Sequence, residues 1–516
     1  MKIIVPMAGV GKRFLKAGYK LPKPLIEIEN KPIIQHVCNL FPSEKDFIFI
    51  CNRQHLKNTK MSKILKKIKP NCKIVEIDQH KLGPVYTISK ALKYIQDNEE
   101  VIVSYCDYGT KWNYKNFLNI LRKKNCDGGI AAYKGFHPHM LGADNYAFIK
   151  EKNNNLLKIK EKKPFTKNRM QEYASNGTYY FKKGAYIKHY FKKLIKGKIS
   201  VKKEFYVSLI YNLLVKDNLK VHIYQIEKML QWGTPIDLKE YLKWSNYFLR
   251  KKKDIGKYYN FKNHINLMLM AGQGQRFRRE GFRTPKPLIQ IDNKPMFVRA
   301  MQSLPLSKKN FFVCKKEHLI KKNLKKEVKK YFNNSTIIPL NKNTKGQASS
   351  CELGLKNIEK SNSVLIGTCD CSIIYDSNKL KKLLDNKKNQ IIVFTFKNNL
   401  SVATKPNDYS YLKINKNNKV LDVSEKRKIS TKPHLDNAIV GIFYFQKINF
   451  FLKGLDLIYK KKHTINGEFY IDSIIKLLAK KKYNIKLFEV ESYIGWGTPN
   501  DLKVFNYWYE YFVKKN

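Results

Sequence analysis

Two glycine loops in the chain have the residue types of a phosphate-binding site. Residues 8–14 read Ala-Gly-Val-Gly-Lys-Arg-Phe, and residues 271–277 read Ala-Gly-Gln-Gly-Gln-Arg-Phe. Glycines let backbone N–H groups turn toward an anion, and a neighbouring guanidinium grips phosphate oxygens. Neither loop has the third glycine of a dinucleotide fingerprint or the Lys-Ser/Thr pair of a Walker A loop. For either loop taken alone, a tight turn between a strand and a helix is the alternative.

A lysine and an aspartate accompany each loop. Pro-Lys-Pro-Leu-Ile begins nine residues after each loop arginine, and its prolines stiffen an extended segment that carries Lys23 or Lys286. Asp107 and Asp370 each end an apolar run, where a carboxylate is a natural Mg²⁺ ligand for a bound triphosphate. A loop aspartate that only makes a turn is the other interpretation. The chain has no Asp-x-Asp motif, which argues against a metal-dependent glycosyltransferase.

These features belong to a repeat of domain size. An offset of 263 residues carries the first glycine loop onto the second and carries the Pro-Lys-Pro segment, His55, Gly83, Asp107 and Tyr146 onto identical residues in the second half. After one inserted residue, an offset of 264 carries Glu161-Lys162, Gly177, Glu204-Phe205-Tyr206 and Trp232-Gly233-Thr234-Pro235 onto Glu425-Lys426, Gly441, Glu468-Phe469-Tyr470 and Trp496-Gly497-Thr498-Pro499. So many rare residues in register indicate a tandem duplication.

Short apolar runs alternate with amphipathic segments in each copy. In the first copy, strands are predicted at residues 3–5, 47–50, 73–77 and 101–105, and helices from Pro32, over 55–68 and over 85–95. This alternation predicts an α/β fold with two tandem, doubly wound, mainly parallel sheets. The glycine loop and Asp107 would lie at the carboxyl ends of the strands, where such sheets bind ligands. The predicted division is a first domain at 1–253, a linker at 254–263 and a second domain at 264–516.

Composition and charge exclude several classes of protein. Hydrophobic residues make up 43% of the 516, which is enough for large cores. The nine cysteines form no C-x-x-C pair, and several lie in apolar runs, as reduced thiols in the cytoplasm do. We expect a cytoplasmic protein without a membrane span, because no signal peptide is evident and no apolar run approaches the roughly 18 residues of a spanning helix.

The formal net charge of +60 has two interpretations. It could reflect affinity for anions such as nucleotides, nucleic acids or an acidic membrane face. Compositional bias is favoured instead, because lysines recur in solvated runs such as 251–253, 460–462 and 480–482. No run combines Lys or Arg with aromatic residues at the spacing of an RNA-binding signature, so nucleic-acid binding is not expected.

The order of these motifs resembles the nucleotidyltransferase (sugar-nucleotide pyrophosphorylase) family. The resemblance rests on G-x-G-x-R-F, P-K-P-L-I, a mid-domain glycine before a helix, an aspartate ending a strand, Glu-Lys, Glu-Phe-Tyr and Gly-Thr-Pro-x-Asp-Leu, and it covers nearly all of both copies. The branch it suggests is found among capsule and surface-polysaccharide genes. The resemblance implies Rossmann-like, GT-A-like domains that use Mg²⁺, an NTP and a sugar phosphate or another small phosphate monoester.

The family implies roles for individual residues. Arg13, Lys23, Arg276 and Lys286 would hold the triphosphate, and Asp107 and Asp370 would bind Mg²⁺. Lys162 and Lys426 would hold the phosphate of the incoming substrate. The expected nucleotide-binding residues are Ala8, Gly9, Gly11 and Gly83 with Ala271, Gly272, Gly274 and Gly346. The expected substrate-binding residues are Glu161, Lys162, Gly177 and Glu204 with Glu425, Lys426, Gly441 and Glu468. The implied reaction is an in-line attack of a phosphate-monoester oxygen on the α-phosphorus, which releases pyrophosphate.

The two copies depart from the family at several positions. Many pyrophosphorylases place a second metal-binding Asp two residues before the Gly of Gly-Thr, where this chain has Gln231 and Gly495. Glu204 and Glu468 are speculative substitutes for that ligand. Asn176 and Ser208 of the first copy become Val440 and Asp472 in the second. The copies are therefore expected either to take different substrates or to differ in catalytic strength.

Other residues have a structural interpretation, and other functions stay open. Thr234 and Thr498 are expected to cap helices that begin at the following proline, with Asp237 or Asp501 at the third helical position. His55 and His318 are expected to cap or pack helices, with phosphate binding as the alternative. Tyr206 and Tyr470 fit either the core or the substrate pocket. The alternative functions are a cytidylyltransferase for a non-sugar phosphate such as phosphocholine, and a fusion with inactive domains that serves as a nucleotide-sugar sensor or scaffold.

Overall fold

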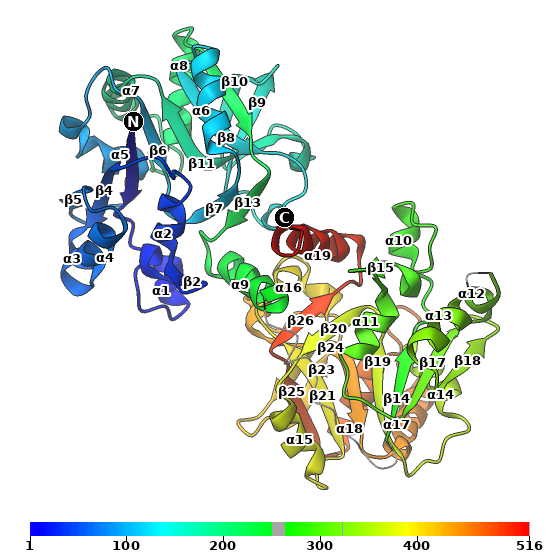
Figure 1. Cartoon of the computed structure of the whole chain (residues 1–516). Helices are drawn as coiled ribbons and strands as arrows, with labels where there is room; N and C mark the ends of the chain where they lie inside the picture. Colours follow the sequence, from blue (N-terminus) through cyan, green and yellow to red (C-terminus); the bar gives the residue numbers. More distant parts are fainter. Residues whose placement is uncertain (250–263, 322, 515–516) are drawn as a thin grey trace. The chain divides into compact units, whose positions relative to one another are not determined.

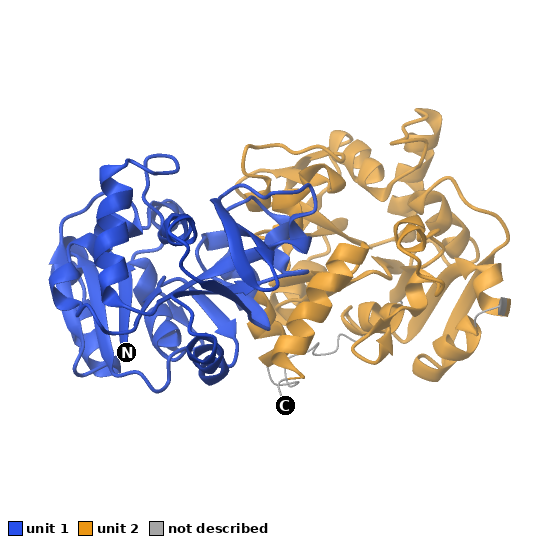
Figure 2. Ribbon diagram, turned by 90° about the horizontal axis from the view of Figure 1, so that it is seen from above, with its two compact units in different colours: residues 1–242 blue, residues 243–516 orange. Residues whose placement is uncertain are grey.

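The computed structural model describes residues 1–249, 264–321 and 323–514, and the chain forms two compact units, Met1–Leu242 and Lys243–Asn516 (Figure 2). The division falls inside helix α9 (Pro235–Leu249), before the predicted domain boundary at residue 253. The predicted linker at 254–263 lies outside the described residues.

The first unit is built on a nine-stranded mixed sheet (Figure 1). Its parallel part has the order β5 (Lys73–Ile77), β4 (Asp46–Asn52), β1 (Lys2–Met7) and β6 (Val101–Ser104). Beyond β6 follow β11 (Tyr173–Phe181), β8 (Gly128–Tyr133), β12 (Val221–Gln225), β10 (Asn155–Glu161) and β9 (Ala147–Lys152). Strand β11 is antiparallel to β6 and β8, and it also forms an antiparallel pair with β9. The apolar runs become buried strands because both faces of the sheet are covered; Ile3, Ile4 and Val5 have no exposed surface.

The second unit repeats this plan. Its sheet has the order β18 (Ser335–Leu340), β17 (Lys309–Lys315), β14 (His264–Leu269), β19 (Ser363–Thr368), β24 (Asn437–Phe445), β21 (Ile391–Phe396) and β25 (Ile485–Glu489), with the hairpin β22 (Tyr411–Ile414) and β23 (Val420–Ser424) joined to β24. Alternate residues of β14 enter opposite cores: Leu267 packs with α14 (Gln347–Leu355), α17 (Ile448–Lys460) and α18 (Ile471–Lys480), and Met268 with α11 (Met296–Gln302), α13 (Leu324–Tyr331) and α15 (Ser377–Asp385). Helical layers on both faces confirm the predicted doubly wound α/β fold.

The helices of the first unit are shorter than predicted. They are α1 (Lys12–Lys16), α2 (Ile33–Cys38), α3 (Arg53–Asn58), α4 (Met61–Ile68), α5 (Pro84–Ser89), α6 (Tyr114–Lys123), α7 (Gly184–Lys196) and α8 (Val207–Lys216). The continuous helix predicted at 55–68 is wrong, because Thr59 leaves the helical conformation and its hydroxyl accepts from the N–H of Met61, which starts α4. The helix predicted at 85–95 is also wrong in length: α5 ends at Ser89, and only a 3₁₀ turn follows at Leu92–Tyr94.

The second unit also contains three short helices, α10 (Gln275–Arg279), α12 (Lys316–Lys321) and α16 (Leu400–Thr404), and a longer one, α19 (Pro499–Phe512). Thr498 caps α19 in a reciprocal capping box with Asp501, and the Thr234 hydroxyl accepts from the N–H of Asp237 at 3.3 Å. The structural interpretation of both threonines is confirmed. Among the described residues, none of the helices combines the length and the apolar character that crossing a bilayer requires.

Two small ribbons place the strand-end aspartates. In the first unit β7 (Tyr108–Lys111) pairs with β13 (Lys228–Gln231), and in the second β20 (Cys371–Ile374) pairs with β26 (Ser492–Gly495). The N–H groups of the buried Trp232 and Trp496 donate to the carbonyls of Asp107 and Asp370 at 3.2 and 2.7 Å. The Trp-Gly-Thr-Pro motif is therefore anchored directly on the predicted metal-binding aspartate.

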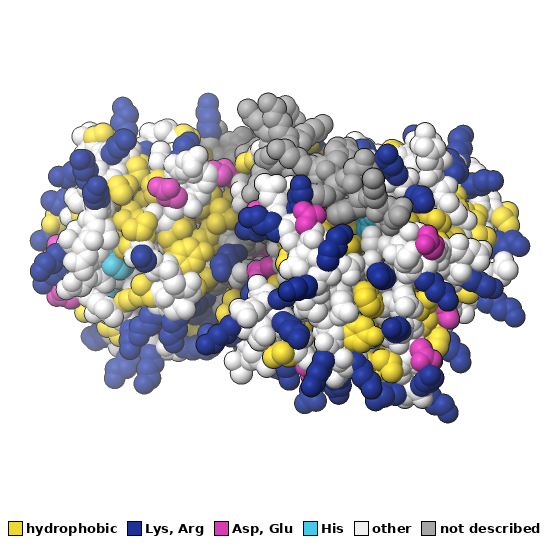
Figure 3. Space-filling view, turned by 90° about the horizontal axis from the view of Figure 1, so that it is seen from below, with side chains coloured by type: hydrophobic (Ala, Val, Ile, Leu, Met, Phe, Trp, Pro, Cys, Tyr) yellow, Lys and Arg dark blue, Asp and Glu magenta, His cyan; other side chains and the backbone are white. Residues whose placement is uncertain are grey.

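The positive charge is distributed rather than concentrated on the face drawn in Figure 3. There, Lys and Arg side chains are spread over both units and alternate with polar and hydrophobic side chains. A nucleic-acid groove gathers its cations along one path. This face therefore gives no support to nucleic-acid binding.

Candidate active site

A cavity of about 620 Å³ in the first unit collects the predicted residues of the first copy. Its walls include Ala8, Gly9, Gly11, Arg13, Lys23, Gly83, Asp107, Glu161, Lys162, Gly177 and Glu204. The walls also include residues that the motifs did not single out as ligands: His80, Lys81, Thr87, Tyr105, Asn145, Ser175, Tyr179 and Met229. These residues have no distinctive spacing, and only the fold reveals that they face the same space.

A lysine–carboxylate pair lies on one wall of this cavity. Lys23 Nζ donates to Asp107 Oδ2 at 2.7 Å, and Lys286 Nζ to Asp370 Oδ2 at 2.6 Å in the second unit. Burial lowers the pKa of each lysine, but the neighbouring carboxylate outweighs it and the pKa is raised overall. Both ammonium groups therefore stay charged at neutral pH, beside a carboxylate that can also face a cation.

The glycine loops have the backbone that their sequence requires. Gly11 and Gly274 adopt φ values of 67° and 62°, in the left-handed region, directly before α1 and α10. The following arginines differ between the copies. Arg13 has no ion pair with a described residue, whereas Arg276 Nη1 lies 3.7 Å from a carboxylate oxygen of Asp408. Asn145 occupies the position of Asp408 in the first copy, so the second loop faces an additional negative charge.

Gly83 and the Glu-Phe-Tyr motif form one structure. The N–H of Phe205 donates to the carbonyl of Leu82 at 2.9 Å, and the N–H of Val85 donates to the carbonyl of Phe205 at 3.1 Å. Gly83 has a φ of 86°, and a Cβ there would lie 2.8 Å from the backbone of Phe205. Gly346 repeats this arrangement against Phe469 with a φ of 112°. The mid-domain glycine thus permits the close approach that brings Glu204 into the cavity.

The opposite end of the cavity holds a polar chain in the first unit. Lys162 Nζ donates to the hydroxyl of Tyr206, which in turn donates to Glu204. Tyr206 is both packed in the core and part of the cavity wall, so both interpretations of this residue hold. Glu161 accepts from Ser208 at 2.6 Å, and burial raises the pKa of Glu161 to about 7.

The equivalent glutamate of the second unit is held differently. Glu425 accepts from Lys476 at 2.7 Å, from Ser473 and from His463 at 2.9 Å. Burial alone would raise the pKa of Glu425, but these donors lower it overall. Asp472, the counterpart of Ser208, accepts from Ser410 at 2.5 Å instead of bonding Glu425. Lys426 Nζ donates to the carbonyl of Asp408 at 2.7 Å.

The side chains near Asp370 are aliphatic or aromatic where their first-copy counterparts near Asp107 are different residues. In the first unit Asn176 donates to the Thr110 hydroxyl at 3.0 Å, and the counterparts of this pair are Val440 and Ile373. Tyr493, the counterpart of Met229, stacks on Phe396 with ring centroids 4.1 Å apart. A Cβ at Gly495 would lie 2.8 Å from the hydroxyl of Tyr493, so this ring fills the space that a side chain at 495 would take.

Gln231 and Gly495 supply no carboxylate at the position of the family's second metal ligand. Gln231 Oε1 instead accepts from the N–H of Gly233 at 3.1 Å. In the part of the chain that the structure describes, no group of three or more His, Cys, Asp or Glu side chains could hold a metal ion. A single carboxylate per site still fits Mg²⁺, because this ion is often held by one carboxylate together with substrate phosphates and water.

His55 and His318 both lie inside helices, α3 and α12, as side chains that pack rather than cap. Asn52 provides the cap of α3, where its side chain accepts from the N–H of Gln54 at 2.8 Å. His318 is 5% exposed.

Comparison with known families assigns both halves to related groups. Residues 3–164 match the family described as MobA-like NTP transferase domain, and residues 265–509 match the family described as Nucleotidyl transferase. The two matches lie on the two copies of the repeat.

Individual relatives are distant. The chain is 26% identical over 215 residues to the bifunctional protein GlmU of Fervidobacterium nodosum, which covers 42% of this chain and 44% of that protein. It is 34% identical over 124 residues to the 2-C-methyl-D-erythritol 4-phosphate cytidylyltransferase of Wigglesworthia glossinidia brevipalpis, which covers 23% of this chain and 49% of that protein. It thus spans about half the length of these curated relatives. A solved nucleoside-diphosphate-sugar pyrophosphorylase from Vibrio cholerae RC9 aligns over 46% of this chain and 99% of its own, with 20% identity and a TM-score of 0.39.

Proposed function

We propose that this chain, which carries two nucleotidyltransferase domains in tandem, joins an NTP to a sugar phosphate and releases pyrophosphate. The observation that carries the proposal is the cavity of the first unit, which joins the glycine loop and the Lys23–Asp107 pair to the Glu161, Lys162 and Glu204 group. The product would be a nucleotide-activated sugar for capsule or surface-polysaccharide assembly. We place the reaction in the cytoplasm because all nine cysteines are free thiols.

In this proposal, different residues of the cavity hold the two substrates. The glycine loop, Arg13 and Lys23 hold the triphosphate, and Lys162 holds the phosphate of the monoester. A monoester oxygen attacks the α-phosphorus, the bond between the α-phosphorus and the oxygen bridging to the β-phosphorus breaks, and pyrophosphate leaves with that oxygen. Catalysis by alignment and fixed positive charge needs no protein nucleophile.

Asp107 is the residue that would hold Mg²⁺ in the first domain. The bound ion would neutralise charge on the phosphate oxygens. The Lys23 ammonium keeps one carboxylate oxygen of Asp107 oriented, and the backbone of Gly233 leaves room for that carboxylate because a Cβ there would lie 2.9 Å from Oδ2. Glu204 accepts from Tyr206 in the same cavity, and we propose it as a substrate-binding residue.

We assign turnover to the first domain. In the second domain Asp408 places a carboxylate beside Arg276, and Tyr493 with Phe396 occupies the space next to Gly495. Both changes work against the two substrates: the carboxylate repels a triphosphate, and the stacked rings reduce the room for an acceptor. In this proposal, the second domain either turns over more slowly than the first or only binds its ligands.

The direct test is release of pyrophosphate from the full chain with Mg²⁺, each of the four NTPs, and a panel of phosphate monoesters. The panel combines hexose 1-phosphates with non-sugar acceptors such as phosphocholine and 2-C-methyl-D-erythritol 4-phosphate. Release that depends on one NTP and one acceptor supports the proposal, and the preferred acceptor separates a sugar from a non-sugar substrate. Silence across the panel overturns it in favour of the sensor or scaffold.

The contrast between Glu161 and Glu425 predicts opposite effects of pH on stability. The pKa of Glu161 is raised to about 7, against about 4.3 in an unfolded chain, so the folded state binds more protons between these values. Stability from Glu161 is therefore complete below about pH 4.3 and is lost as pH rises through 7, by about 3–4 kcal/mol in total. We expect Glu161→Gln to remove that loss when urea unfolding is compared at pH 5 and pH 8.

Glu425→Gln is the matched control. Because the pKa of Glu425 is lowered by its donors, its contribution is present above the unfolded value and is lost as pH falls. This variant should reduce stability at pH 8 more than at pH 4. A Glu161→Gln protein with the same change between pH 5 and pH 8 as the original chain would contradict the assignment.

A further inference from the structure

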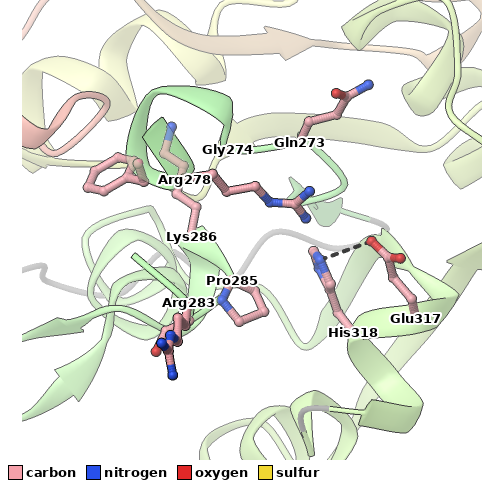
Figure 4. A pocket seen from close by; sticks show the side chains of 10 residues that line it. Gln273, Gly274, Arg278, Arg283, Pro285, Lys286, Glu317 and His318 are labelled. Atoms are coloured by element: carbon pink, nitrogen blue, oxygen red, sulfur yellow. Dashed lines mark ion pairs between the residues drawn. The ribbon is translucent and has the colours of Figure 1, made fainter. Parts of the chain in front are cut away.

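A second cavity, of about 170 Å³, lies in the second unit against the glycine loop (Figure 4). We call it the rear pocket. Its walls come from the loop (Gln273, Gly274), from α10 (Phe277, Arg278), from the segment Arg283–Lys286 and from the start of α12 (Glu317, His318). Arg276 and Asp370, which face the proposed nucleotide, are not among its lining residues. The rear pocket is thus distinct from that site, although it shares Gly274 and Lys286 with it.

His318 presents unsatisfied polar atoms to the rear pocket. Its side chain is buried, and neither ring nitrogen has a hydrogen-bond partner among the described residues. The closest charged atom is Glu317 Oε1, 3.5 Å from Nε2, which is too far for a good hydrogen bond. Leaving such a group buried and unpaired is unfavourable, so its partner is expected to come from outside the chain. The neutral imidazole offers one donor and one acceptor.

Two guanidinium groups accompany this histidine. Arg278 and Arg283 line the rear pocket, and neither guanidinium group forms an ion pair or hydrogen bond with a residue of the described ranges. Figure 4 shows the guanidinium of Arg278 extended into the space between Gln273 and His318. Guanidinium groups bind phosphate through two parallel N–H donors. The Arg278 guanidinium and the unpaired imidazole therefore face one space that suits a phosphate group, and Arg283 adds a second cation to the lining of the pocket.

The first copy has the same fold and the same histidine, His55, but lacks other polar residues of the rear pocket. The residues equivalent to Arg278, Arg283, Thr284 and Glu317 are Leu15, Lys20, Leu21 and Gln54. Leu15 and Leu21 are exposed apolar side chains in the first unit. The repeat therefore does not require the polar residues of the rear pocket, and their presence in one copy points to a ligand there.

We propose that the rear pocket binds a small phosphate monoester that carries a hydroxyl group. Arg278 and Arg283 pair with its phosphate, His318 bonds it through a ring nitrogen, and Glu317 accepts from its hydroxyl. The carboxylate of Glu317 favours such a mixed ligand over a bare anion. Because the ligand contacts Gly274 and the Lys286 segment, it alters NTP affinity in the second domain, and NTP alters its affinity by the same factor. Binding of the monoester does not depend on the proposed reaction, whereas its effect on NTP affinity rests on the proposed NTP site of the second domain.

The test follows the His318 ring by NMR of the full chain with ¹³C-labelled histidine, the signal being identified by its loss in His318→Gln. Glycerol 3-phosphate and inorganic phosphate are titrated separately at constant ionic strength. We expect a saturable shift, with glycerol 3-phosphate binding more tightly. The double variant Arg278→Leu/Arg283→Lys, which installs the first copy's residues, should weaken binding at least about tenfold.

Arg276→Ala is the matched control, because it removes one cation from the same loop but not from the rear pocket. It should leave the His318 titration unchanged, and thermal unfolding checks that each variant is folded. A His318 signal that does not saturate with either probe, or an unchanged affinity in the double variant, overturns the proposal. Preference for inorganic phosphate over glycerol 3-phosphate would contradict the role of Glu317.

Discussion

Replacing Asp107 with Asn is expected to lower the rate of pyrophosphate release by about 10³-fold. The substitution preserves the shape of the side chain but removes the charge that would hold Mg²⁺ and that pairs with Lys23 at 2.7 Å. Lys23 then loses its partner and is free to bind the triphosphate in an unproductive position. The rate is measured with saturating NTP and acceptor, and the free Mg²⁺ concentration is varied to show whether extra metal restores activity.

Asp370→Asn is the control that separates the two domains. It removes the same charge from the same kind of lysine pair, yet the first domain remains intact. We expect the rate to stay within about twofold of the original, because a site in the other domain that acts independently makes no contribution to this step. Equal losses in both variants would show that both domains turn over and that Asp408 and Tyr493 do not block the second. If neither variant lowers turnover, the metal assignment is wrong.

The local features of the site were predictable because they follow from residue chemistry. Gly11 and Gly274 have the left-handed backbone that a glycine loop requires, and the paired prolines hold Lys23 and Lys286 in defined directions. The doubly wound fold followed from the alternation of apolar runs and amphipathic segments, and it is confirmed. The roles of the individual site residues stay predictions.

Long-range contacts and the state of buried charges could not be predicted from these motifs. Gly83 and Phe205 are far apart in the sequence, and nothing in one amino-acid sequence indicates that they are in contact. The sequence shows Glu161 and Glu425 in equivalent positions, but their opposite pKa shifts depend on partners from other elements, Ser208 in one unit and Lys476 and His463 in the other. The length of the helix predicted at 55–68 was wrong for a local reason. The apolar pattern continues past Thr59, but the helix stops there.

Gly83→Ala is expected to destabilise the first domain by about 3–5 kcal/mol. An alanine at a φ of 86° is strained, and its Cβ would lie 2.8 Å from the backbone N and O of Phe205. Neither atom can move independently, because the N–H of Phe205 bonds the carbonyl of Leu82 and its carbonyl accepts from Val85. Relief therefore requires the Glu204–Tyr206 segment to shift away from α5.

Thermal unfolding is measured by calorimetry, and Gly9→Ala is the control. A Cβ at Gly9 would meet no atom within 4 Å, so this loop variant should unfold like the original chain. Gly346→Ala should destabilise the second domain similarly, because its Cβ would lie 2.6 Å from the carbonyl oxygen of Phe469 at a φ of 112°. The shift of Glu204 and Tyr206 also moves the partners of Lys162, so any remaining activity of Gly83→Ala should show a raised KM for the phosphate monoester. A Gly83→Ala protein as stable as Gly9→Ala would mean that the contact between α5 and the Glu-Phe-Tyr segment yields easily and does not fix the acceptor end of the cavity.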